Sequence, residues 1–171
     1  MLFRSGAQRA QGRPQRTLSL WLGQKIQAVP RSARISTREI IDVAAAALLD
    51  GGGRVLIAQR PPGKSHAGRW EFPGGKFELG ESATAALARE LREEVGVEVR
   101  DPELLCTLEH DDPQRRVRLH LFAVERYTGE PVALDGQALK WVPLGTLATE
   151  DILEADRPFV AALQRRFATA I

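Results

Sequence analysis

The chain has 171 residues, of which 43% are hydrophobic and 27% charged, enough for one domain with a sizeable core. Its longest apolar run, Val43 to Leu49, is too short to cross a bilayer, and its single cysteine, Cys106, excludes an internal disulfide. Residues 1–38 carry eight basic and no acidic residues, whereas the remainder carries all 22 acidic residues and a net charge of −6. The pI near 9.0 therefore comes from the first 38 residues and is a weak argument for nucleic-acid binding.

Residues 1–38 are rich in arginine and show little hydrophobic periodicity, so we expect an unstructured extension, or a start assigned upstream of the true one. A mitochondrial transit peptide and a basic arm that binds nucleic acid are the alternatives. The folded domain is expected to span residues 39–171. We expect a cytoplasmic protein, or a mitochondrial one if the extension is a transit peptide.

The first half of this domain reads as strands followed by a helix. Residues 41–49 and 54–60 predict two strands joined by a hairpin turn, because the glycines between them allow positive φ. Residues 61–68 read as a loop, and residues 70–75 as a short strand that Pro73 interrupts. Ser82 can cap a helix from about residue 83 to 95, and Gly96 can end it.

The second half predicts three strands and a terminal helix. Residues 102–110 and 117–127 read as strands, and the second alternates so that one face carries Val117, Leu119, Leu121 and Ala123. Residues 138–144 predict a further strand, ended by Pro143, and residues 157–167 an amphipathic helix. Strands dominate over two helices, so the fold class is α+β, arranged as an α/β/α sandwich around a mixed sheet.

Three glutamates cluster on one side of the predicted helix 83–95. Glu90, Glu93 and Glu94 share an arc of roughly 100°, which borders an apolar stripe of Leu87, Leu91 and Val95. Like charges at i, i+4 repel, and Arg89 at i+4 from Glu93 leaves two carboxylates without a partner. A solvated helix surface is one interpretation, and a divalent cation bound by oxygen ligands is the other.

A longer pattern favours the cation. Gly75 is followed after five residues by Glu81 and after seven more by Arg89-Glu90-Leu91; Glu93-Glu94 and Gly96-Val97 complete the pattern. This run resembles the complete Nudix box, G-x5-E-x7-R-E-U-x-E-E-x-G-U, where U is aliphatic. All nine defined positions match, and a chance match in a chain of this length is on the order of 10⁻⁷ or rarer. From about residue 42 to 167 the chain looks like the MutT-type branch of the Nudix hydrolases.

The resemblance implies a Nudix-type α/β/α sandwich with a mixed central sheet and a loop-helix-loop catalytic motif. It also implies hydrolysis of nucleoside triphosphates to the monophosphate and pyrophosphate with Mg²⁺, or with Mn²⁺ in its place. The implied substrate is 8-oxo-dGTP, whose removal cleans the nucleotide pool and prevents mutation. The alternatives are a Nudix hydrolase for a cytidine nucleotide, a nucleotide sugar or ADP-ribose, and a non-catalytic Nudix-fold binding module. We expect a small-molecule partner, no stable nucleic-acid complex, no membrane and a monomer.

The resemblance also assigns roles on the metal side. Glu90, Glu93 and Glu94 are the implied metal ligands, with Gly75, through its carbonyl, and Asp135 as further ligands. Glu90 is the first candidate for the general base, and Asp135 is the alternative. Arg89 is expected to orient and partly neutralise the glutamates. Glu81 lies near the helix start, where a carboxylate is favoured, and is either catalytic or structural.

Three further positions match substrate-binding residues of the family. Arg60 is implied to contact phosphate, with an exposed strand end as the alternative. Phe72 either stacks on the base or packs in the core. Asp156 matches the residue that reads the base edge, which is often Asn in enzymes for 8-oxo-dGTP and Asp in MutT-like enzymes for altered cytosine nucleotides. An ionised Asp only accepts hydrogen bonds, whereas an amide also donates, so the preferred base stays open.

Overall fold

The computed structural model describes residues 39–111 and 116–167. The predicted extension, residues 1–38, lies outside the described residues, so its nature and the boundary of the folded domain stay predictions. Among the described residues, no helix has the length and apolar character needed to cross a membrane.

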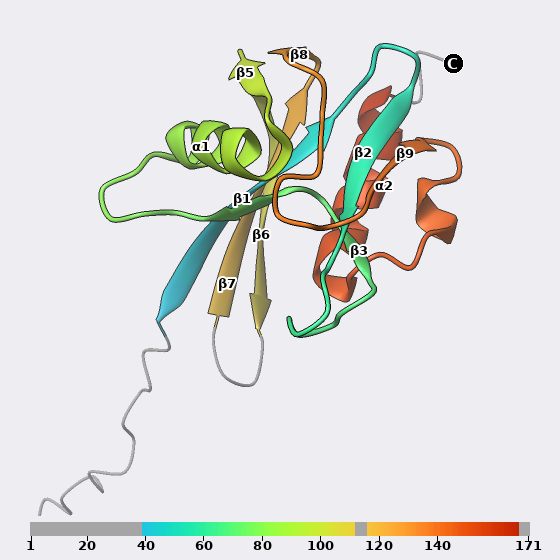
Figure 1. Ribbon diagram of the computed structural model, residues 1–171. Helices are drawn as coiled ribbons and strands as arrows, with labels where there is room; N and C mark the ends of the chain where they lie inside the picture. Colours follow the sequence, from blue (N-terminus) through green and yellow to red (C-terminus); the bar gives the residue numbers. More distant parts are fainter. Residues whose placement is uncertain (1–38, 112–115, 168–171) are drawn as a thin grey trace, which may run out of the picture. The chain divides into compact units, whose positions relative to one another are not determined.

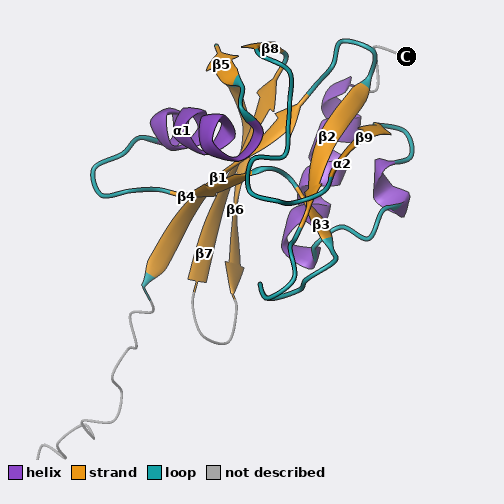
Figure 2. Cartoon of the chain, in the orientation of Figure 1, coloured by secondary structure: helices purple, strands orange, loops and turns teal. Residues whose placement is uncertain are grey.

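The described residues form nine strands, two α-helices and two short 3₁₀ helices (Figure 2). The strands are β1 (Ile40–Leu48), β2 (Arg54–Gln59), β3 (Trp70–Glu71), β4 (Gly74–Lys76), β5 (Glu98–Arg100), β6 (Glu103–Asp111), β7 (Arg116–Val124), β8 (Arg126–Thr128) and β9 (Leu139–Pro143). The helices are α1 (Ala83–Val95), η1 (Leu147–Thr149), η2 (Glu154–Asp156) and α2 (Arg157–Phe167). Both predicted α-helices are confirmed, whereas β5 and β8, which pair with each other, were not predicted as a separate unit.

The largest sheet has the strand order β4-β1-β7-β6. It is mixed, as predicted, because β1 pairs in parallel with β7 while its other two pairings are antiparallel. Its two faces belong to two apolar clusters. Leu48 and Phe122 pack with α1 on one face, whereas Leu121 packs with Phe159 of α2 in the cluster on the other face. Figure 1 shows the two helices on opposite sides of this sheet. The expected sandwich is therefore confirmed.

The alternation predicted along β7 is also confirmed, because Leu119, Leu121 and Ala123 are buried in the α2-side cluster, with Val117 packed against it. The single cysteine, Cys106, is half-buried at the edge of the same cluster. Burial raises the pKa of its thiol, consistent with a small packing residue.

The hairpin turn predicted between the first two strands is present, but the two strands do not continue as a paired hairpin. β1 and β2 share an isolated bridge, Leu49 to Val55, and then enter different sheets. The turn itself is closed locally, since the Asp50 carboxylate accepts from the backbone nitrogens of Gly52 and Arg54 at 2.9 and 3.0 Å. The strands diverge because β1 takes β4 and β7 as neighbours, whereas β2 takes β3 and β9.

The segment predicted as one short strand around Pro73 is divided in the same way. β3 pairs with β2 in the smaller sheet, and β4 pairs with β1 in the larger one. Pro73 lies between them, where no backbone N–H is available for a ladder. This crossing carries the chain from one sheet to the other directly before the Nudix-like box.

Candidate active site

Helix α1 has the bounds that the sequence predicts. The Ser82 hydroxyl accepts a hydrogen bond from the Ala85 nitrogen at 3.2 Å, and Gly96 ends the helix with a φ of 71°. Leu87, Leu91 and Val95 are fully buried against the large sheet. The loop-helix-loop unit therefore has one fixed face, and the predicted carboxylates border it.

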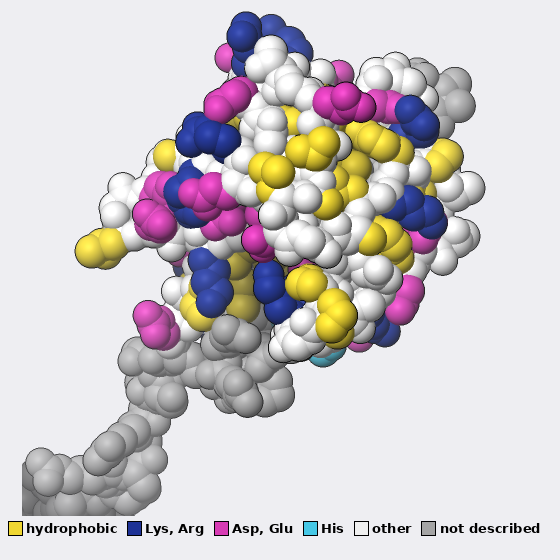
Figure 3. Space-filling model, in the orientation of Figure 1, with side chains coloured by type: hydrophobic (Ala, Val, Ile, Leu, Met, Phe, Trp, Pro, Cys, Tyr) yellow, Lys and Arg dark blue, Asp and Glu magenta, His cyan; other side chains and the backbone are white. Residues whose placement is uncertain are grey.

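Arg89 joins the glutamates of the box (Figure 3 shows acidic side chains gathered around basic ones near α1). Its guanidinium donates to both oxygens of Glu81 at 2.9 Å, to Glu90 at 2.8 Å and to Glu93 at 3.2 Å. It also donates to the carbonyl of Lys76 at 2.9 Å. These hydrogen bonds raise the pKa of Arg89 and lower the pKa of Glu81. The sequence predicted the pair with Glu93 but missed the bonds to Glu81 and Glu90.

Two glycines bring the backbone of β4 against these carboxylates. A Cβ on Gly75 would lie 2.3 Å from the carboxyl carbon of Glu90, so no larger residue fits while Glu90 keeps its place. A Cβ on Gly74, which has a φ of 146°, would lie 2.1 Å from the Ala44 carbonyl oxygen. Gly75 therefore lets the backbone of β4 lie against the Glu90 carboxyl group, and its predicted role as a metal ligand stays a prediction.

Glu94 is half-buried and bonds to the backbone at the start of β4. It accepts a hydrogen bond from the Gly74 nitrogen at 3.1 Å. Burial raises the pKa of Glu94 to about 7; the Gly74 bond opposes that rise, and the negative charges of Glu90 and Glu71 add to it. A nearby cation would favour its ionised form.

The donor chemistry here fits a hard divalent cation, because the side chains of Glu90, Glu93 and Glu94 offer only oxygen atoms as ligands. Gly75, which has no side chain, leaves its backbone accessible next to Glu90. Within residues 39–111 and 116–167, no three His, Cys, Asp or Glu side chains already converge as a metal site. Glu90 and Glu93 are instead paired with Arg89. Each of these two carboxylates bonds to the guanidinium through one oxygen, so its second oxygen is not used by Arg89.

Asp135 lies beside this region but does not join it. Its side chain is 59% exposed and lies 3.8 Å from the Lys64 ammonium. Asp135 and Glu94 line the same small cavity. Gln137, which the sequence did not single out, connects them: it accepts from the Asp135 nitrogen and donates to the Glu94 carbonyl, both at 2.9 Å. Its burial, which no local pattern indicates, is the reason it was missed.

A larger cavity of about 450 Å³ lies on the α2-side face of the large sheet. Its apolar floor comes from β1 and β7, namely Ile41, Val43, Val117 and Leu119. Polar side chains from separate segments complete the lining, among them Arg60, His66, Arg69, Glu71, Lys76 and Asp156. This volume and this mixture of apolar and convergent polar groups suit a small ligand.

Asp156 is buried, with 6% of its surface exposed, at the end of η2. The strand-like pairing of Trp70 with Ile152 holds this segment, and the Phe72 nitrogen donates to the Asp156 carboxylate at 3.2 Å. Burial raises the pKa of Asp156 to about 7; the Phe72 bond opposes the rise, and Glu71 adds to it. Asp156 therefore changes its charge near neutral pH inside the cavity.

Phe72 does not offer a free ring at this cavity. It is 3% exposed and packs edge to face on Phe159, with 6.4 Å between ring centroids. Of the two interpretations of Phe72, the structure favours the core residue over the base-stacking one. Its backbone nitrogen, not its ring, reaches the polar part of the site.

Arg60 already has hydrogen-bond partners within the protein. Its guanidinium pairs with Glu71 and donates to the carbonyl of Ser65 at 2.7 Å. Burial raises the pKa of Glu71, against the opposing effect of Arg60. Glu71 lines both cavities, although no pattern in the sequence singled it out. A phosphate that binds Arg60 would have to accept hydrogen bonds from a guanidinium that also bonds to Glu71 and Ser65.

Comparison with known proteins fits this arrangement. An 8-oxo-dGTP diphosphatase from Escherichia coli (strain K12) is 35% identical over 125 residues, which are 73% of this chain and 97% of the relative. A CTP pyrophosphohydrolase from the same organism is 38% identical over 117 residues, 68% of this chain and 87% of the relative. A solved structure from work on MutT of Aliivibrio salmonicida and Vibrio cholerae superposes with a TM-score of 0.68 at 32% identity, covering 75% of this chain and all of the other.

The family model for the NUDIX domain matches residues 40–163, which include both cavities and the whole of α1. Members of this family generally require a divalent metal ion, in agreement with the oxygen donors on α1. The chain belongs to the NUDIX family.

Proposed function

We propose that this protein is a Mg²⁺-dependent hydrolase that converts nucleoside triphosphates to the monophosphate and pyrophosphate, with 8-oxo-dGTP as its substrate. The observation that carries the proposal is the intact set of box carboxylates on α1, of which Glu94 lines the small cavity; Glu71 lines both this cavity and the one of about 450 Å³, which is large enough for a nucleoside. The names of the relatives support the same class of reaction.

Glu90, Glu93 and Glu94 would hold the cation, with Gly75 and Asp135 as further candidates. When bound, Mg²⁺ neutralises polyphosphate charge and lowers the pKa of a coordinated water. Arg89 fixes Glu90 and Glu81 in place before any ligand binds. Glu90 is the first candidate for the general base because it lies directly against Gly75, and Asp135 is the alternative because it is exposed at the rim of the small cavity.

The phosphate and base ends of the substrate would be held by different groups. Arg60 and Lys76 supply positive charge at the large cavity, and Lys64 supplies it at the small one. The ionised Asp156 carboxylate would accept the N7 hydrogen that 8-oxoguanine carries and guanine lacks. The Asp156 carboxylate would thereby favour the oxidised base.

A cytidine nucleotide is the second candidate substrate. The pKa of about 7 at Asp156 means that a protonated form, which donates a hydrogen bond, exists near neutral pH. This form would donate to an acceptor atom on the edge of a cytosine base. The relative named CTP pyrophosphohydrolase favours the same candidate. We propose free nucleotides in the cytoplasm as the partners, with a monomeric protein and no stable nucleic-acid complex.

The test is pyrophosphate release measured with 8-oxo-dGTP, dGTP, dCTP, 5-hydroxy-dCTP and CTP, and AMP release measured with ADP-ribose, each with Mg²⁺ and with excess chelator. The proposal expects the highest kcat/KM for 8-oxo-dGTP and no turnover with chelator. A higher kcat/KM for a cytosine nucleotide would replace the substrate but keep the reaction. No turnover of any compound would leave the non-catalytic binding module as the better interpretation.

A further inference from the structure

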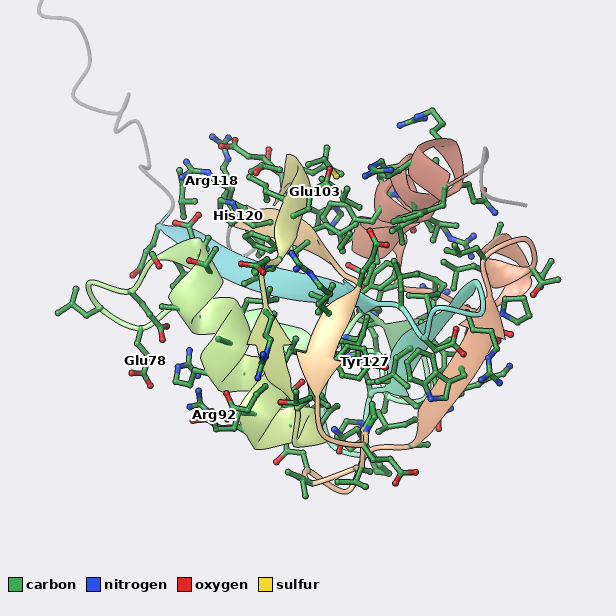
Figure 4. All side chains as sticks on the ribbon, turned by 90° about the horizontal axis from the view of Figure 1, so that it is seen from above. Glu78, Arg92, Glu103, Arg118, His120 and Tyr127 are labelled. Carbon is green, nitrogen blue, oxygen red and sulfur yellow. The ribbon has the colours of Figure 1, made fainter. Side chains whose placement is uncertain are left out.

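A chain of hydrogen bonds crosses the α1-side face of the large sheet, beyond the end of α1. His120 of β7 lies between Asp42 of β1 and Thr107 of β6. Its Nε2 atom is 2.9 Å from the Asp42 carboxylate, and its Nδ1 atom is 3.2 Å from the Thr107 hydroxyl. Only 16% of the His120 side chain is exposed. Figure 4 shows it next to Arg118, which projects from the same strand.

Both nitrogens of the His120 ring thus have a partner. Because a carboxylate only accepts, Nε2 carries the hydrogen that is shared with Asp42. The Thr107 hydroxyl can either donate to Nδ1 or accept from it, since a hydroxyl does both. The orientation of the ring is therefore fixed from two neighbouring strands.

The ring supports Phe77, the first residue after β4. The two ring centroids are 5.2 Å apart with an angle of 36° between the planes. The Phe77 nitrogen donates to the Asp42 carbonyl at 3.0 Å, so the side chain and the backbone of Phe77 are both held at the same place. Phe77 directly follows Gly75 and Lys76 and begins the loop to Glu81.

Phe77 and Lys76 have different surroundings. Lys76, opposite Val43 in the ladder, lines the large cavity, whereas Phe77 packs with the α1-side cluster. The Lys76 carbonyl accepts from Arg89, the residue that organises the box glutamates. A shift of Phe77 would therefore move both the cavity wall and the anchor of the Arg89 network.

We infer that His120 is a positioning residue for the box: held by Asp42 and Thr107, it supports Phe77 and so fixes where the Gly75–Glu81 segment leaves the sheet. The inference rests on the proposed function, because it assumes that this segment presents the metal-binding carboxylates. Neither of the two cavities described above is lined by Asp42, Thr107 or His120, so these residues do not form part of the proposed substrate site.

The first test replaces His120 with Ala and measures two quantities. We expect kcat with Mg²⁺ and 8-oxo-dGTP to fall about tenfold, because small displacements of a catalytic segment are costly. We expect KM to change less than kcat, since the apolar floor of the nucleoside cavity lies on the other face of the sheet. Electron paramagnetic resonance of free Mn²⁺, without nucleotide, should show several-fold weaker Mn²⁺ binding.

A double-mutant cycle tests whether the effect passes through Phe77. If it does, His120→Ala together with Phe77→Leu should lower kcat little more than the stronger single variant. Arg118→Gln is the matched control: it removes a charge 3.5 Å from the same Asp42 oxygen and 3.3 Å from Glu109, on the same strand as His120. Arg118→Gln should keep kcat and Mn²⁺ affinity.

Thr107→Val keeps the test valid if His120→Ala does not fold, because Thr107 is exposed and its loss frees only Nδ1. It should reduce kcat about two- to threefold with little change in melting temperature. Unchanged kcat and Mn²⁺ affinity in folded His120→Ala, or in Thr107→Val, would overturn the inference, as would additive effects in the cycle. An unmodified protein that neither turns over nucleotides nor binds Mn²⁺ would instead overturn the proposed function.

Discussion

The carboxylates on the metal side come from one helix, whereas the lining of the large cavity comes from segments spread between Ile41 and Asp156. On the metal side, spacing within α1 and the residues before it sets which groups meet. At the cavity, β1, β7, the loop after β2 and η2 must all be in place before Asp156 faces the ligand. The first region is local in sequence, and the second depends on the whole fold.

This difference predicts how the two regions fail. A change on α1 should remove turnover for every nucleotide alike, because all of them share the phosphates. A change at Asp156 should alter the choice of base and leave turnover of other nucleotides largely intact. The predictions below test this separation, beginning with the largest effect.

Glu90→Gln should lower kcat at least a thousandfold, because it removes a proposed metal ligand and the first candidate for the base. The ratio of kcat/KM for 8-oxo-dGTP to that for dGTP should stay the same. Loss of the ionic attraction to Arg89 offsets the relief of repulsion with Glu94, so the melting temperature should change little. Steady-state kinetics and thermal melting measure these outcomes.

Glu98→Gln is the control for this substitution, since Glu98 is also paired with an arginine, Arg92, but lies beyond the end of the helix. It should keep full activity. Near-normal turnover in Glu90→Gln would remove Glu90 from the proposed mechanism, and a changed base preference would show that the two regions are not separate.

Gly75→Ala should lower kcat about a hundredfold. The added Cβ would lie 2.3 Å from the Glu90 carboxyl carbon, so the carboxylate must move. Gly145→Ala is the control, because a Cβ there meets nothing within 4 Å. A Gly75→Ala variant with the turnover of the Gly145→Ala variant would show that the position of Glu90 against β4 is unimportant.

Asp156→Ala should reduce the preference for 8-oxo-dGTP over dGTP about ten- to hundredfold, the range expected when one buried polar contact is lost. In the unmodified protein the preference should increase from pH 6 to pH 8, because with a pKa of about 7 Asp156 changes from protonated to ionised within this range. The control is Asp101→Ala, an exposed carboxylate paired with Arg126. If the preference for 8-oxo-dGTP over dGTP changes neither with the substitution nor with pH, Asp156 does not recognise the base.

The contrast between the two regions also explains what the sequence could predict. Helix α1, its caps at Ser82 and Gly96, and its buried stripe follow from spacing alone, and the structure has them at the predicted positions. The resemblance to the Nudix box identified the glutamates, but not that Arg89 bonds to Glu81 and Glu90. Those bonds depend on how the loop before α1 returns to the helix.

The residues that sequence reasoning left open or did not single out all depend on contacts between distant segments. Phe72 is a core residue because Phe159, far along the chain, covers its ring. Glu71 and Gln137 lie at the cavities because β3 and the segment before β9 are brought beside the end of α1. After the predicted turn, β1 and β2 separate because their other pairing partners lie in different sheets. Patterns within a short stretch of sequence do not indicate such contacts between distant segments.

The smallest expected effect is on stability, and it tests the burial of Asp156 without any ligand. A carboxyl whose pKa is raised on folding, here from 3.8 to about 7, binds more protons in the folded state than in the unfolded one between these values. Its contribution to stability is therefore full below about pH 4, falls as the pH rises toward 7, and is constant above. Asp156→Asn removes this contribution, so the melting temperature of the variant relative to the unmodified protein should rise between pH 5 and pH 8.

Thermal melting with chelator present measures the difference, and Asp135→Asn, at an exposed carboxylate, is the control that should show no such trend. A constant difference across this pH range would mean that Asp156 is ionised in the folded protein at pH 5, and both the pH-dependent preference and the protonated form proposed for a cytosine base would then fail.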